Sequence, residues 1–275
     1  MPVDRTSQEQ GRRVWAAGDW DEVAGYVQGI GPRLLDALDI TPGMTLLDIA
    51  AGSGSSVAIP AALRGADVVA SDLVAQHFEA GRRRARRAGA DLEWVEADAL
   101  DLPFADGAFD RVASAIGHMF APDHALAASE AARVCRPGGF LGFACWTPEG
   151  VIGQMFRATS AYLPPPPAGS TPPPLWGDER HVRDLLEPLG LEVRCERLVN
   201  VFVDDSIEAY HQGTEKHFGP LVAARETLDA DSWDALRTDL DRIFRDANLA
   251  TDGTMRFEGE YLQIIAHKPD SSRGT

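Results

Sequence analysis

Short apolar runs alternate with longer amphipathic or alanine-rich segments between residues 44 and 146. The apolar runs are typical of buried β-strands, and the segments between them have helical spacing or composition. The predicted strands are 44–50, 66–73, 92–98, 109–116 and 139–146, and the predicted helices are 56–65, 74–89 and 123–139. Strands that alternate with helices in this way form a parallel sheet covered on both faces, which predicts a Rossmann-like α/β fold.

The pattern changes on both sides of this core. Residues 1–43 look mainly helical and predict an N-terminal helical cap, whereas residues 162–176 are dominated by proline and predict a stiff, extended connector. A ligand for a proline-binding module is the alternative interpretation of that proline segment. Further on, the chain predicts a short helix, a strand, two or three helices and a last strand, at 178–190, 191–203, 206–248 and 254–269.

These elements together predict a mostly parallel seven-stranded sheet with helices on both faces, an N-terminal helical cap and a helical insertion before the last strand. A length of 275 residues fits one large α/β domain or two small ones, and we predict one domain. Its predicted parts are the cap 1–43, the core 44–146, elements 147–250 that form a lid, a closing strand 251–269 and a disordered tail 270–275.

The composition adds a strongly acidic charge balance. The chain has 42 acidic and 26 basic residues, for a net charge of −16. Each contact to a phosphate needs a positive group, so this balance argues against nucleic acid and against an anionic membrane as partners. One basic run, at 81–87, lies in a predicted helix, and we interpret it as a solvated helix face rather than a phosphate-binding patch.

The cysteines and the apolar segments predict the cellular compartment of the protein and bear on whether it holds a metal. Cys135, Cys145 and Cys195 are odd in number and widely spaced, so they predict neither a disulfide framework nor a paired-cysteine metal site. The seven histidines form no dense cluster with cysteine or aspartate, and we predict no metal site. The N-terminus lacks the apolar region of a secretion signal and no run of 18 apolar residues occurs, which predicts a cytoplasmic protein.

The first predicted strand runs through a glycine turn into the first predicted helix, in the sequence LLDIAAGSGSSVAIPAAL at 46–63. Dinucleotide-binding turns need three glycines, as G-x-G-x-x-G, and an acid about 20 residues further on. Gly52, Gly54 and Asp72 fit this pattern, but valine occupies position 57. Glycines let the backbone approach a ligand, and the acid binds ribose hydroxyls. The turn therefore predicts a nucleotide-like ligand, and the missing third glycine argues against a dehydrogenase.

Neighbouring segments make this interpretation more specific. Asp48 lies within the first strand, the third strand ends in EADA at 96–99 before LDLPFADGAFDRVAS, and RVCRPGGFL leads into the fifth strand. Together these segments resemble the class I S-adenosylmethionine-dependent methyltransferases, and more closely the methyltransferase type 11 branch that includes the UbiE-type quinone C-methyltransferases. GHMFAPDHA, CWTPEG and PLWGDE, at 117–125, 145–150 and 174–179, are similar to a broad group of actinobacterial methyltransferases, mostly of unassigned substrate.

The resemblance implies S-adenosyl-L-methionine as cofactor, S-adenosyl-L-homocysteine as product and residues 44–146 as the cofactor-binding core. Gly52 and Gly54 would make room for the methionine moiety, and Asp48 would orient the turn and the cofactor's amino group. Asp72 would accept both ribose hydroxyls, and Asp98 would accept from the exocyclic amine of adenine. The full implied set, with Ser114 and Ala115 beside the sulfonium, is Asp48, Ala50, Gly52, Ser53, Gly54, Asp72, Leu73, Asp98, Ala99, Ser114 and Ala115.

Methyl transfer is an in-line displacement, so holding the acceptor on the far side of the methyl group can supply most of the catalysis. A base is needed only where the acceptor loses a proton. His118 and His217 are the candidate bases, against the alternative that each is a core or surface histidine satisfied by hydrogen bonds. An apolar acceptor pocket is predicted from residues that are also candidate core residues: Trp15, Trp20, Tyr26, His118, Met119, Trp146, Trp176, Tyr210 and Phe218.

We therefore predict methyl transfer to carbon, oxygen or nitrogen of a small, aromatic or hydrophobic metabolite. The insertion at 206–248 departs from the compact quinone enzymes, so we predict a role in specialised metabolism. Two alternatives stay open: a non-methylating reaction, such as a cyclisation, on the same cofactor site, and a cofactor-sensing binding protein without a substrate. The oligomeric state, monomer or homodimer, stays open as well.

Overall fold

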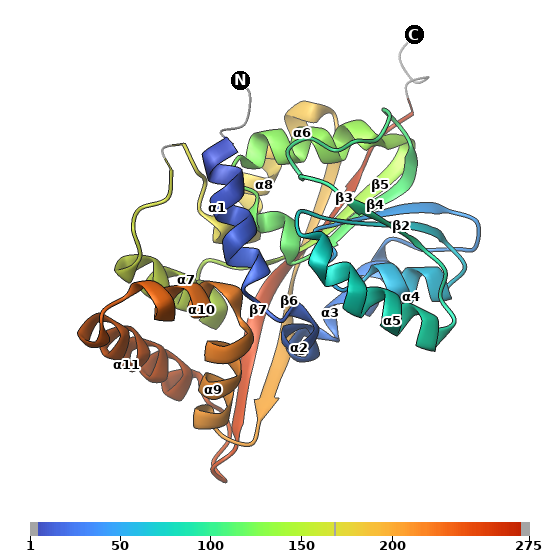
Figure 1. The fold of residues 1–275 in the computed structure, drawn as a ribbon. Helices are drawn as coiled ribbons and strands as arrows, with labels where there is room; N and C mark the ends of the chain where they lie inside the picture. The colour runs from blue at the N-terminus through green and yellow to red at the C-terminus, as the bar shows by residue number, and fades with distance from the viewer. Residues whose placement is uncertain (1–4, 168, 271–275) are drawn as a thin grey trace.

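A single sheet of seven strands forms the centre of the computed structural model, which describes residues 5–167 and 169–270 (Figure 1). The strand order is β3-β2-β1-β4-β5-β7-β6. The strands are β1 Thr45–Ile49, β2 Asp67–Asp72, β3 Glu93–Glu96, β4 Phe109–Ala115, β5 Cys135–Trp146, β6 Glu192–Asp204 and β7 Met255–His267. Strands β1 to β5 pair in parallel, and β7 pairs antiparallel with both β5 and β6. This arrangement confirms the predicted mostly parallel seven-stranded sheet.

Helices cover both faces of this sheet (Figure 1). On one face, Leu34 and Leu35 are buried against Leu46 of β1 and Val68 of β2. Parallel strands that are buried on both faces have nearly continuous apolar sequences, which is why the sequence pattern predicts these strands. The covering helices are α3 Ile30–Ala37, α4 Ala58–Leu63 and α5 Phe78–Ala88 on that face, and α6 His124–Val134 and α8 Glu179–Leu186 on the other.

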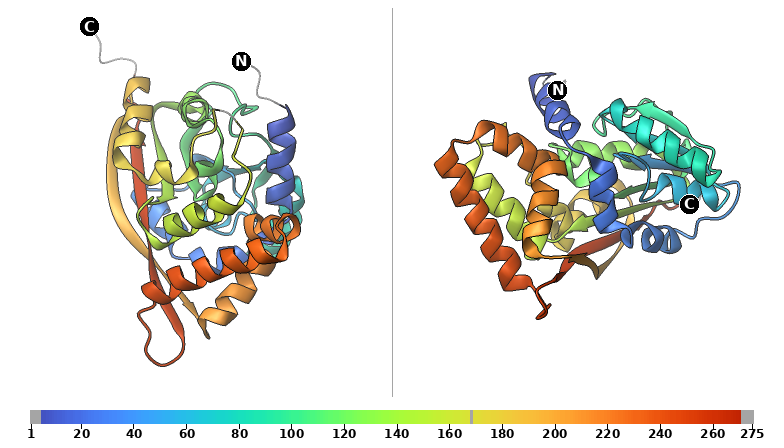
Figure 2. Two further views of the ribbon diagram at one scale, coloured as in Figure 1. Left: turned by 90° about the vertical axis from the view of Figure 1, so that its left-hand side faces the viewer. Right: turned by 60° about the horizontal axis from the view of Figure 1, so that its bottom comes forward.

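The remaining helices lie before β1 or between the late strands, and they extend the molecule beyond the strand ends (Figure 2). They include the predicted N-terminal helices and the predicted helical insertion before the last strand. The N-terminal ones are α1 Arg5–Ala16 and α2 Trp20–Val23, followed by the 3-10 helix η1 Ala24–Val27. The others are α7 Val151–Tyr162, α9 Ile207–His217, α10 Gly219–Thr227 and α11 Ala230–Ala247, with α11 packed against α7 and α9.

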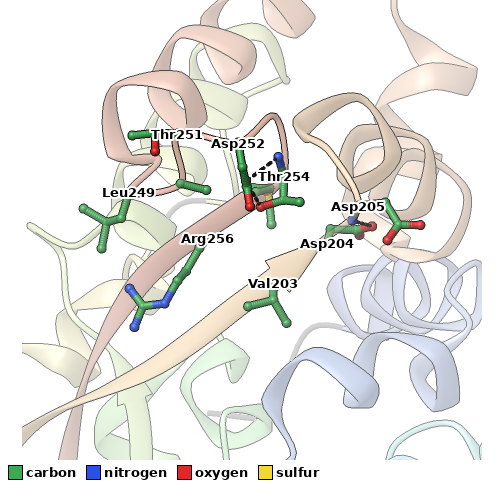
Figure 3. A pocket seen from close by; sticks show the side chains of 10 residues that line it. Val203, Asp204, Asp205, Leu249, Thr251, Asp252, Thr254 and Arg256 are labelled. Atoms are coloured by element: carbon green, nitrogen blue, oxygen red, sulfur yellow. Dashed lines mark hydrogen bonds between the residues drawn. The ribbon is translucent and has the colours of Figure 1, made fainter.

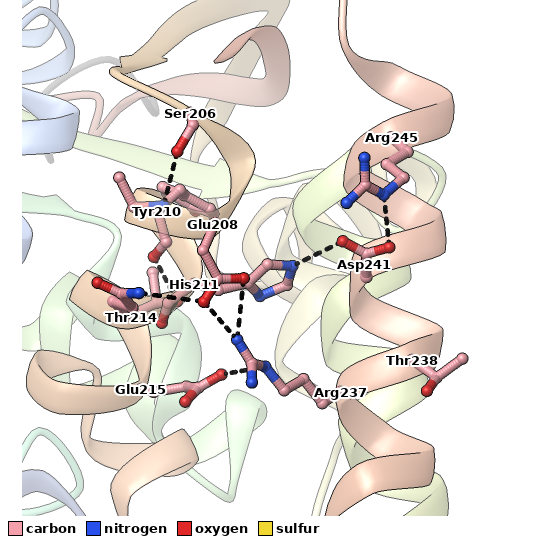
Figure 4. A network of polar contacts seen from close by, with 12 residues as sticks. Ser206, Glu208, Tyr210, His211, Thr214, Glu215, Arg237, Thr238, Asp241 and Arg245 are labelled. Atoms are coloured by element: carbon pink, nitrogen blue, oxygen red, sulfur yellow. Dashed lines mark hydrogen bonds and ion pairs between the residues drawn. The ribbon is translucent and has the colours of Figure 1, made fainter. Parts of the chain in front are cut away.

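Charged side chains join α9 to α11 within the insertion (Figure 4). Arg237 of α11 pairs with Glu208 and Glu215 of α9, each at 2.9 Å. One turn away, Nε2 of the buried His211 lies 3.7 Å from a carboxylate oxygen of Asp241. Exposed ion pairs contribute little free energy individually, so we interpret this network as fixing the orientation of the two helices.

Two details of the predicted elements are wrong: the end of one helix and the conformation at the end of the proline segment. The helix that was predicted to reach residue 139 ends at Val134, and β5 begins at Cys135. Arg136 precedes Pro137, and a residue before proline avoids the helical conformation, so the helix cannot continue. The proline segment ends in a short 3-10 helix, η4 Pro173–Gly177, rather than staying extended, because proline fits the first position of a helical turn.

Parts of three predictions fall on residues that the structure leaves undescribed. They are residues 1–4 of the predicted N-terminal cap, residue 168 of the proline segment and residues 271–275 of the predicted disordered tail. Within the described part of the chain, no helix has both the length and the apolar character that crossing a membrane requires.

Candidate functional site

The turn that follows β1 contains three residues with a left-handed backbone. Ala50, Gly52 and Gly54 have φ angles of 54°, 56° and 69°. Glycine adopts these angles without steric cost, whereas Ala50 is strained and must be held by its surroundings. The N–H of Gly54 donates to the carbonyl of Ala51 at 2.7 Å and closes the turn. The chain is thus folded tightly between β1 and α4, as the glycine pattern predicts.

Two glycines have no room for a side chain: Gly54 within this turn, and Gly117, which follows β4 and packs against the turn. A Cβ on Gly54 would lie 2.8 Å from the Trp94 ring, and one on Gly117 would lie 2.5 Å from the carbonyl oxygen of Ala50. Gly52 differs, because the nearest atom to a Cβ there belongs to Trp20 and is 3.7 Å away. Gly54 and Gly117 therefore serve the packing of the turn, and Gly52 faces its more open side.

Asp48 lies in β1 directly before the turn and is buried. Its Oδ2 accepts the N–H of Ala58 at 3.0 Å and so fixes the first residue of α4. Pro60 follows in the first turn of that helix, where a missing N–H costs nothing because the first four N–H groups have no helical partner. Burial raises the pKa of Asp48 well above its usual range. A buried carboxyl with a strongly shifted pKa beside a ligand-binding turn is typical of a functional site.

Asp72, at the end of β2, contacts the glycine turn directly. Its Oδ2 accepts the N–H of Gly52 at 2.8 Å, and its Oδ1 accepts the N–H of Val74 at 2.9 Å. Burial raises the pKa of Asp72. The end of β3 is fastened alongside, because the N–H of Ala97 donates to the carbonyl of Asp72 at 2.9 Å. Asp98 is the next residue after Ala97, so the turn, Asp72 and Asp98 meet at one corner of the sheet.

The end of β4 is fastened to the same turn. The hydroxyl of Ser114 donates to the carbonyl of Ile49 at 2.6 Å and accepts the N–H of His118 at 3.0 Å. All the predicted cofactor-binding residues therefore lie at the carboxyl ends of four neighbouring strands, β3, β2, β1 and β4. In an open α/β sheet the ligand crevice lies at those ends. The structure brings the predicted set together, and the roles within it stay predictions.

Five aromatic rings stand beside this corner, and we call them the rim cluster: Trp15, Trp20, Phe120, Phe156 and Phe218. Trp15 contacts Trp20 and Phe120, with ring centres 5.3 and 4.6 Å apart. Phe218 lies 5.7 Å from Trp20 and 6.3 Å from Phe156, which in turn lies 5.5 Å from Phe120. Because Trp20 is also the nearest neighbour of position 52, the rim cluster adjoins the open side of the glycine turn.

Three other predicted pocket residues lie elsewhere, around Phe202 of β6. Tyr26, Trp146 and Tyr210 contact that ring, with centres 6.3, 5.7 and 6.3 Å apart. The hydroxyl of Tyr26 donates to a carboxylate oxygen of Asp204 at 2.8 Å. Trp146 and Tyr210 are buried in the main core. The structure does not bring these three residues together with the rim cluster.

His118, Met119 and Trp176 lie in a third place, within the main core, where His118 and Trp176 contact Phe143 of β5. Met119 and Trp176 are fully buried, and His118 is almost so. The imidazole of His118 stacks on Phe143 with ring centres 4.7 Å apart and meets Trp176 edge-on at 4.9 Å. Burial lowers the pKa of His118 to about 3, so its ring is neutral near pH 7. The ring is packed like a core side chain, but neither of its nitrogens has a hydrogen-bond partner among the described residues, and its role as a base stays a prediction.

His217, the second candidate base, lies beside the rim cluster. It directly precedes Phe218, and its carbonyl accepts the N–H of Asp19 at 2.9 Å. Its ring Nδ1 lies 3.9 Å from a carboxylate oxygen of Asp19. Of the two predicted bases, His217 is therefore the one that neighbours the aromatic rings at the turn.

Sequence reasoning does not find three residues at this corner: Arg12, His77 and Phe156. Arg12 donates to the carbonyl of Leu73 at 2.6 Å and also pairs with a carboxylate at the end of β3. His77 interacts electrostatically with Asp72, and burial lowers its pKa. Arg12 and Phe156 lie in helices far along the chain from the turn, so no local motif marks them. The nearness of His77 to Asp72 in the sequence is the one usable signal.

A surface hollow lies in another region, where β6 ends and β7 begins (Figure 3). Val203, Asp204, Leu249 and Arg256 are among the residues that line it. None of its lining residues belongs to the predicted cofactor set or to the predicted pocket. We therefore place the candidate site at the strand ends and not in this hollow.

Comparison with known proteins identifies the class. Residues 47–143 match a family described as a methyltransferase domain. That segment contains the glycine turn, Asp48, Asp72, Asp98 and Ser114. The chain belongs to the class I S-adenosylmethionine-dependent methyltransferases.

Its full-length relatives include an uncharacterised protein of Mycobacterium tuberculosis. The two sequences are 39% identical over 267 residues, which cover 96% of each chain. A demethylmenaquinone methyltransferase of Thermus thermophilus is 37% identical over 115 residues, which cover 41% of this chain and 52% of that enzyme. The likeness to the quinone enzyme is thus confined to part of the chain, whereas the mycobacterial likeness spans nearly all of it.

Solved structures share the fold at low sequence identity. The YcgJ protein of Bacillus subtilis has a TM-score of 0.61 and 16% identity, over 87% of this chain and 98% of its own. The cyclase SpnF has a TM-score of 0.55 and 18% identity, over 88% of this chain and 80% of its own. At such identities the likeness shows the fold alone.

S-adenosylmethionine is the methyl donor of this class, and the residues at the strand ends fit its chemistry. Its ribose hydroxyls and its amines are hydrogen-bond donors, and the carboxyl groups of Asp48, Asp72 and Asp98 supply acceptors at the ends of β1, β2 and β3. Gly52 leaves the turn open on the side that faces Trp20. We find no mismatch between this donor and acceptor set and the cofactor.

Asp48→Asn should make the protein more stable at neutral pH. The pKa of Asp48 is raised from 3.8 by burial, so ionising this carboxyl costs stability as the pH rises above about 4. An amide oxygen can keep the Ala58 hydrogen bond without a charge, and we expect a gain of about 0.5–2 kcal/mol in the free energy of unfolding. Thermal unfolding between about pH 4 and 8 measures it. Asp67→Asn, at the exposed start of β2, is the control, and a gain that does not grow with pH would contradict the argument.

Proposed function

We propose that this protein transfers a methyl group from S-adenosylmethionine to carbon, oxygen or nitrogen of a small aromatic or hydrophobic metabolite, in specialised metabolism. The observation that supports this substrate class is the rim cluster, in which Trp20 adjoins the open side of the glycine turn. Aromatic walls suit a flat or apolar molecule. The net charge of −16 disfavours a polyanionic acceptor.

The cofactor supplies an electrophilic methyl group on a sulfonium. The chain's contribution is to hold the acceptor in line with that group, which is worth roughly 7–11 kcal/mol in well-oriented intramolecular reactions. In the proposed site, Asp72 accepts the ribose hydroxyls and Asp98 binds the adenine edge. Gly52 gives the methionine moiety room, and Ser114 and Ala115 lie beside the sulfonium. The rim cluster orients the acceptor and excludes water.

An acceptor that loses a proton needs a base close to the reacting atom. We propose His217 for this role ahead of His118. His217 borders the rim cluster, whereas the buried His118 has a pKa of about 3 and is a weak proton acceptor. An acceptor whose nucleophilic atom carries no proton to be lost would need neither residue.

The same site can also serve a non-methylating reaction, because one fold hosts many chemistries and a cyclase shares this one. A cofactor-sensing protein is the other alternative. In the proposed arrangement, helices α1 and α2 of the predicted cap 1–43, and helices α7, α9, α10 and α11 of the predicted lid 147–250, cover the strand ends of the core at 44–146, all within one cytoplasmic domain. The rest of those two ranges belongs to the sheet and its covering helices, since β6 is a strand of the sheet and α3 and α8 lie on its faces. The aromatic rings contributed by both the cap and the lid favour an enzyme with an acceptor over a sensor.

An acceptor screen tests the proposal. The purified protein is incubated with S-adenosylmethionine and a panel of phenols, indoles and aromatic carboxylic acids, and both S-adenosylhomocysteine and methylated product are measured. We expect acceptor-dependent release of S-adenosylhomocysteine that Phe156→Ala, in the rim cluster, reduces. Conversion of an acceptor without that release would favour the cyclisation, and cofactor binding with no conversion of any acceptor would favour the sensor.

A further inference from the structure

The segment before β1 crosses the strand ends that hold the proposed cofactor site. In Figure 1 and in the right-hand view of Figure 2, α1 lies between the insertion helices and α5. Residues 12–21 of this segment make contacts on both of its sides. The segment therefore bridges the cofactor half of the sheet and the helical insertion.

On the cofactor side, three contacts hold α1 to the ends of β2 and β3 and to the residues just after β2. The guanidinium of Arg12 donates to the carbonyl of Leu73 at 2.6 Å and pairs with the carboxylate of Glu96. The side-chain amide of Gln76 donates to the carbonyl of Ala16 at 2.6 Å. Leu73 directly follows Asp72 in the sequence, and Glu96 lies two residues before Asp98. Arg12 thus contacts both strand ends where the ribose and adenine are proposed to bind.

On the insertion side, the same segment contacts the end of α9. The N–H of Asp19 donates to the carbonyl of His217 at 2.9 Å. The ring of Trp20 lies 5.7 Å from that of Phe218, and its Cβ adjoins the glycine turn at position 52. Trp20 therefore lies against both the glycine turn and the insertion.

We propose that Arg12 is a positioning residue for the cofactor. By holding α1 on Leu73 and Glu96, it keeps residues 12–21 closed over the ribose and adenine positions. Both partners of the ion pair are partly exposed, with 43% and 49% of their side-chain surface accessible, so the pair is weak and the segment can open without unfolding the core. This inference rests on the proposed cofactor site at the strand ends.

Arg12→Gln should release S-adenosylhomocysteine about 3- to 10-fold faster than the wild type, with an unchanged thermal midpoint. Stopped-flow displacement monitored by tryptophan fluorescence measures this rate, as does dissociation in a separate surface plasmon resonance experiment. Arg12→Lys keeps the charge and should recover part of the slow release. Glu96→Gln removes the partner carboxylate and should also accelerate release, which keeps the proposal testable if Arg12→Gln fails to fold.

Arg64→Gln is the matched control. Arg64 also pairs with a carboxylate, that of Asp36 at 2.7 Å, and donates to the carbonyl of Pro32 at 3.4 Å, but it lies at the C-terminal end of α4, shortly before β2 begins. The Arg64→Gln variant should release S-adenosylhomocysteine at the same rate as the wild type. Equal rates in wild type and Arg12→Gln, or the same acceleration in Arg64→Gln, would overturn the positioning role alone. Failure of the wild type to bind S-adenosylhomocysteine would overturn the cofactor site as well.

Discussion

Replacing Asp72 by alanine should weaken the binding of S-adenosylhomocysteine about 10- to 100-fold. The carboxylate is the proposed acceptor of both ribose hydroxyls, and it also holds the N–H of Gly52 at 2.8 Å. Alanine removes a charged acceptor and leaves the turn without that contact. Isothermal titration calorimetry measures the affinity. Because burial raises the pKa of Asp72, wild-type affinity should also fall as the pH is lowered and the carboxyl becomes protonated.

Asp67→Ala is the matched control for this experiment. Asp67 is exposed at the opposite end of the same strand, so its replacement should leave the affinity unchanged. Thermal unfolding of Asp72→Ala should accompany the titration, because the N–H groups of Gly52 and Val74 lose their acceptor. Asp72→Asn keeps an acceptor for one of these two N–H groups. It therefore distinguishes a loss of affinity caused by misfolding from one caused by the missing carboxylate. Wild-type affinity in a folded Asp72→Ala protein would refute the assignment of Asp72 to the ribose.

Trp176→Ala should lower the free energy of unfolding by about 3–5 kcal/mol. Trp176 is fully buried, and its ring centre lies 4.9, 5.3 and 5.7 Å from those of His118, Phe143 and His124. Close-packed neighbours cannot fill the space that the indole leaves, so the lost contacts are not replaced. Chemical denaturation, followed by circular dichroism, measures the change.

Trp176→Phe is the control for size and polarity. The indole N–H of Trp176 is buried and has no hydrogen-bond partner among the described residues. Phenylalanine keeps an aromatic ring and removes that donor, so we expect a smaller cost than that of alanine. The sequence predicts Trp176 in the acceptor pocket instead. A small loss of stability in Trp176→Ala, together with a large loss of acceptor turnover, would support the pocket and contradict the role in packing.

The meeting of the predicted cofactor-binding residues at one corner of the sheet could be predicted because its signals are local in the sequence. Asp48, Gly52 and Gly54 belong to one strand, turn and helix, and the folded chain has this unit where the pattern places it. Asp72 and Asp98 end the next two strands, and parallel strands bring their carboxyl ends to one edge. The order of those strands follows from the class of fold. No information about distant contacts was required.

The arrangement of the aromatic residues could not be predicted, because it depends on contacts between distant segments. Trp20 and Tyr26 are close in the sequence, yet Trp20 meets Phe218 in the rim cluster and Tyr26 meets Phe202 of β6. The turn of the chain through α2 and η1 separates them. Composition alone does not distinguish a tryptophan at the rim, such as Trp20, from one in the core, such as Trp176. The contacts of Arg12 are equally remote in sequence.

The central claim is that Gly52, Asp72 and Asp98 hold one adenosyl-sulfur compound at the ends of β1, β2 and β3. A crystal structure of the protein with S-adenosylhomocysteine tests it most directly. We expect the ribose hydroxyls within hydrogen-bonding distance of the Asp72 carboxylate, the adenine amine at Asp98 and the methionine moiety against Gly52. A ligand bound elsewhere, with no contact to Asp72 or Asp98, would contradict the account.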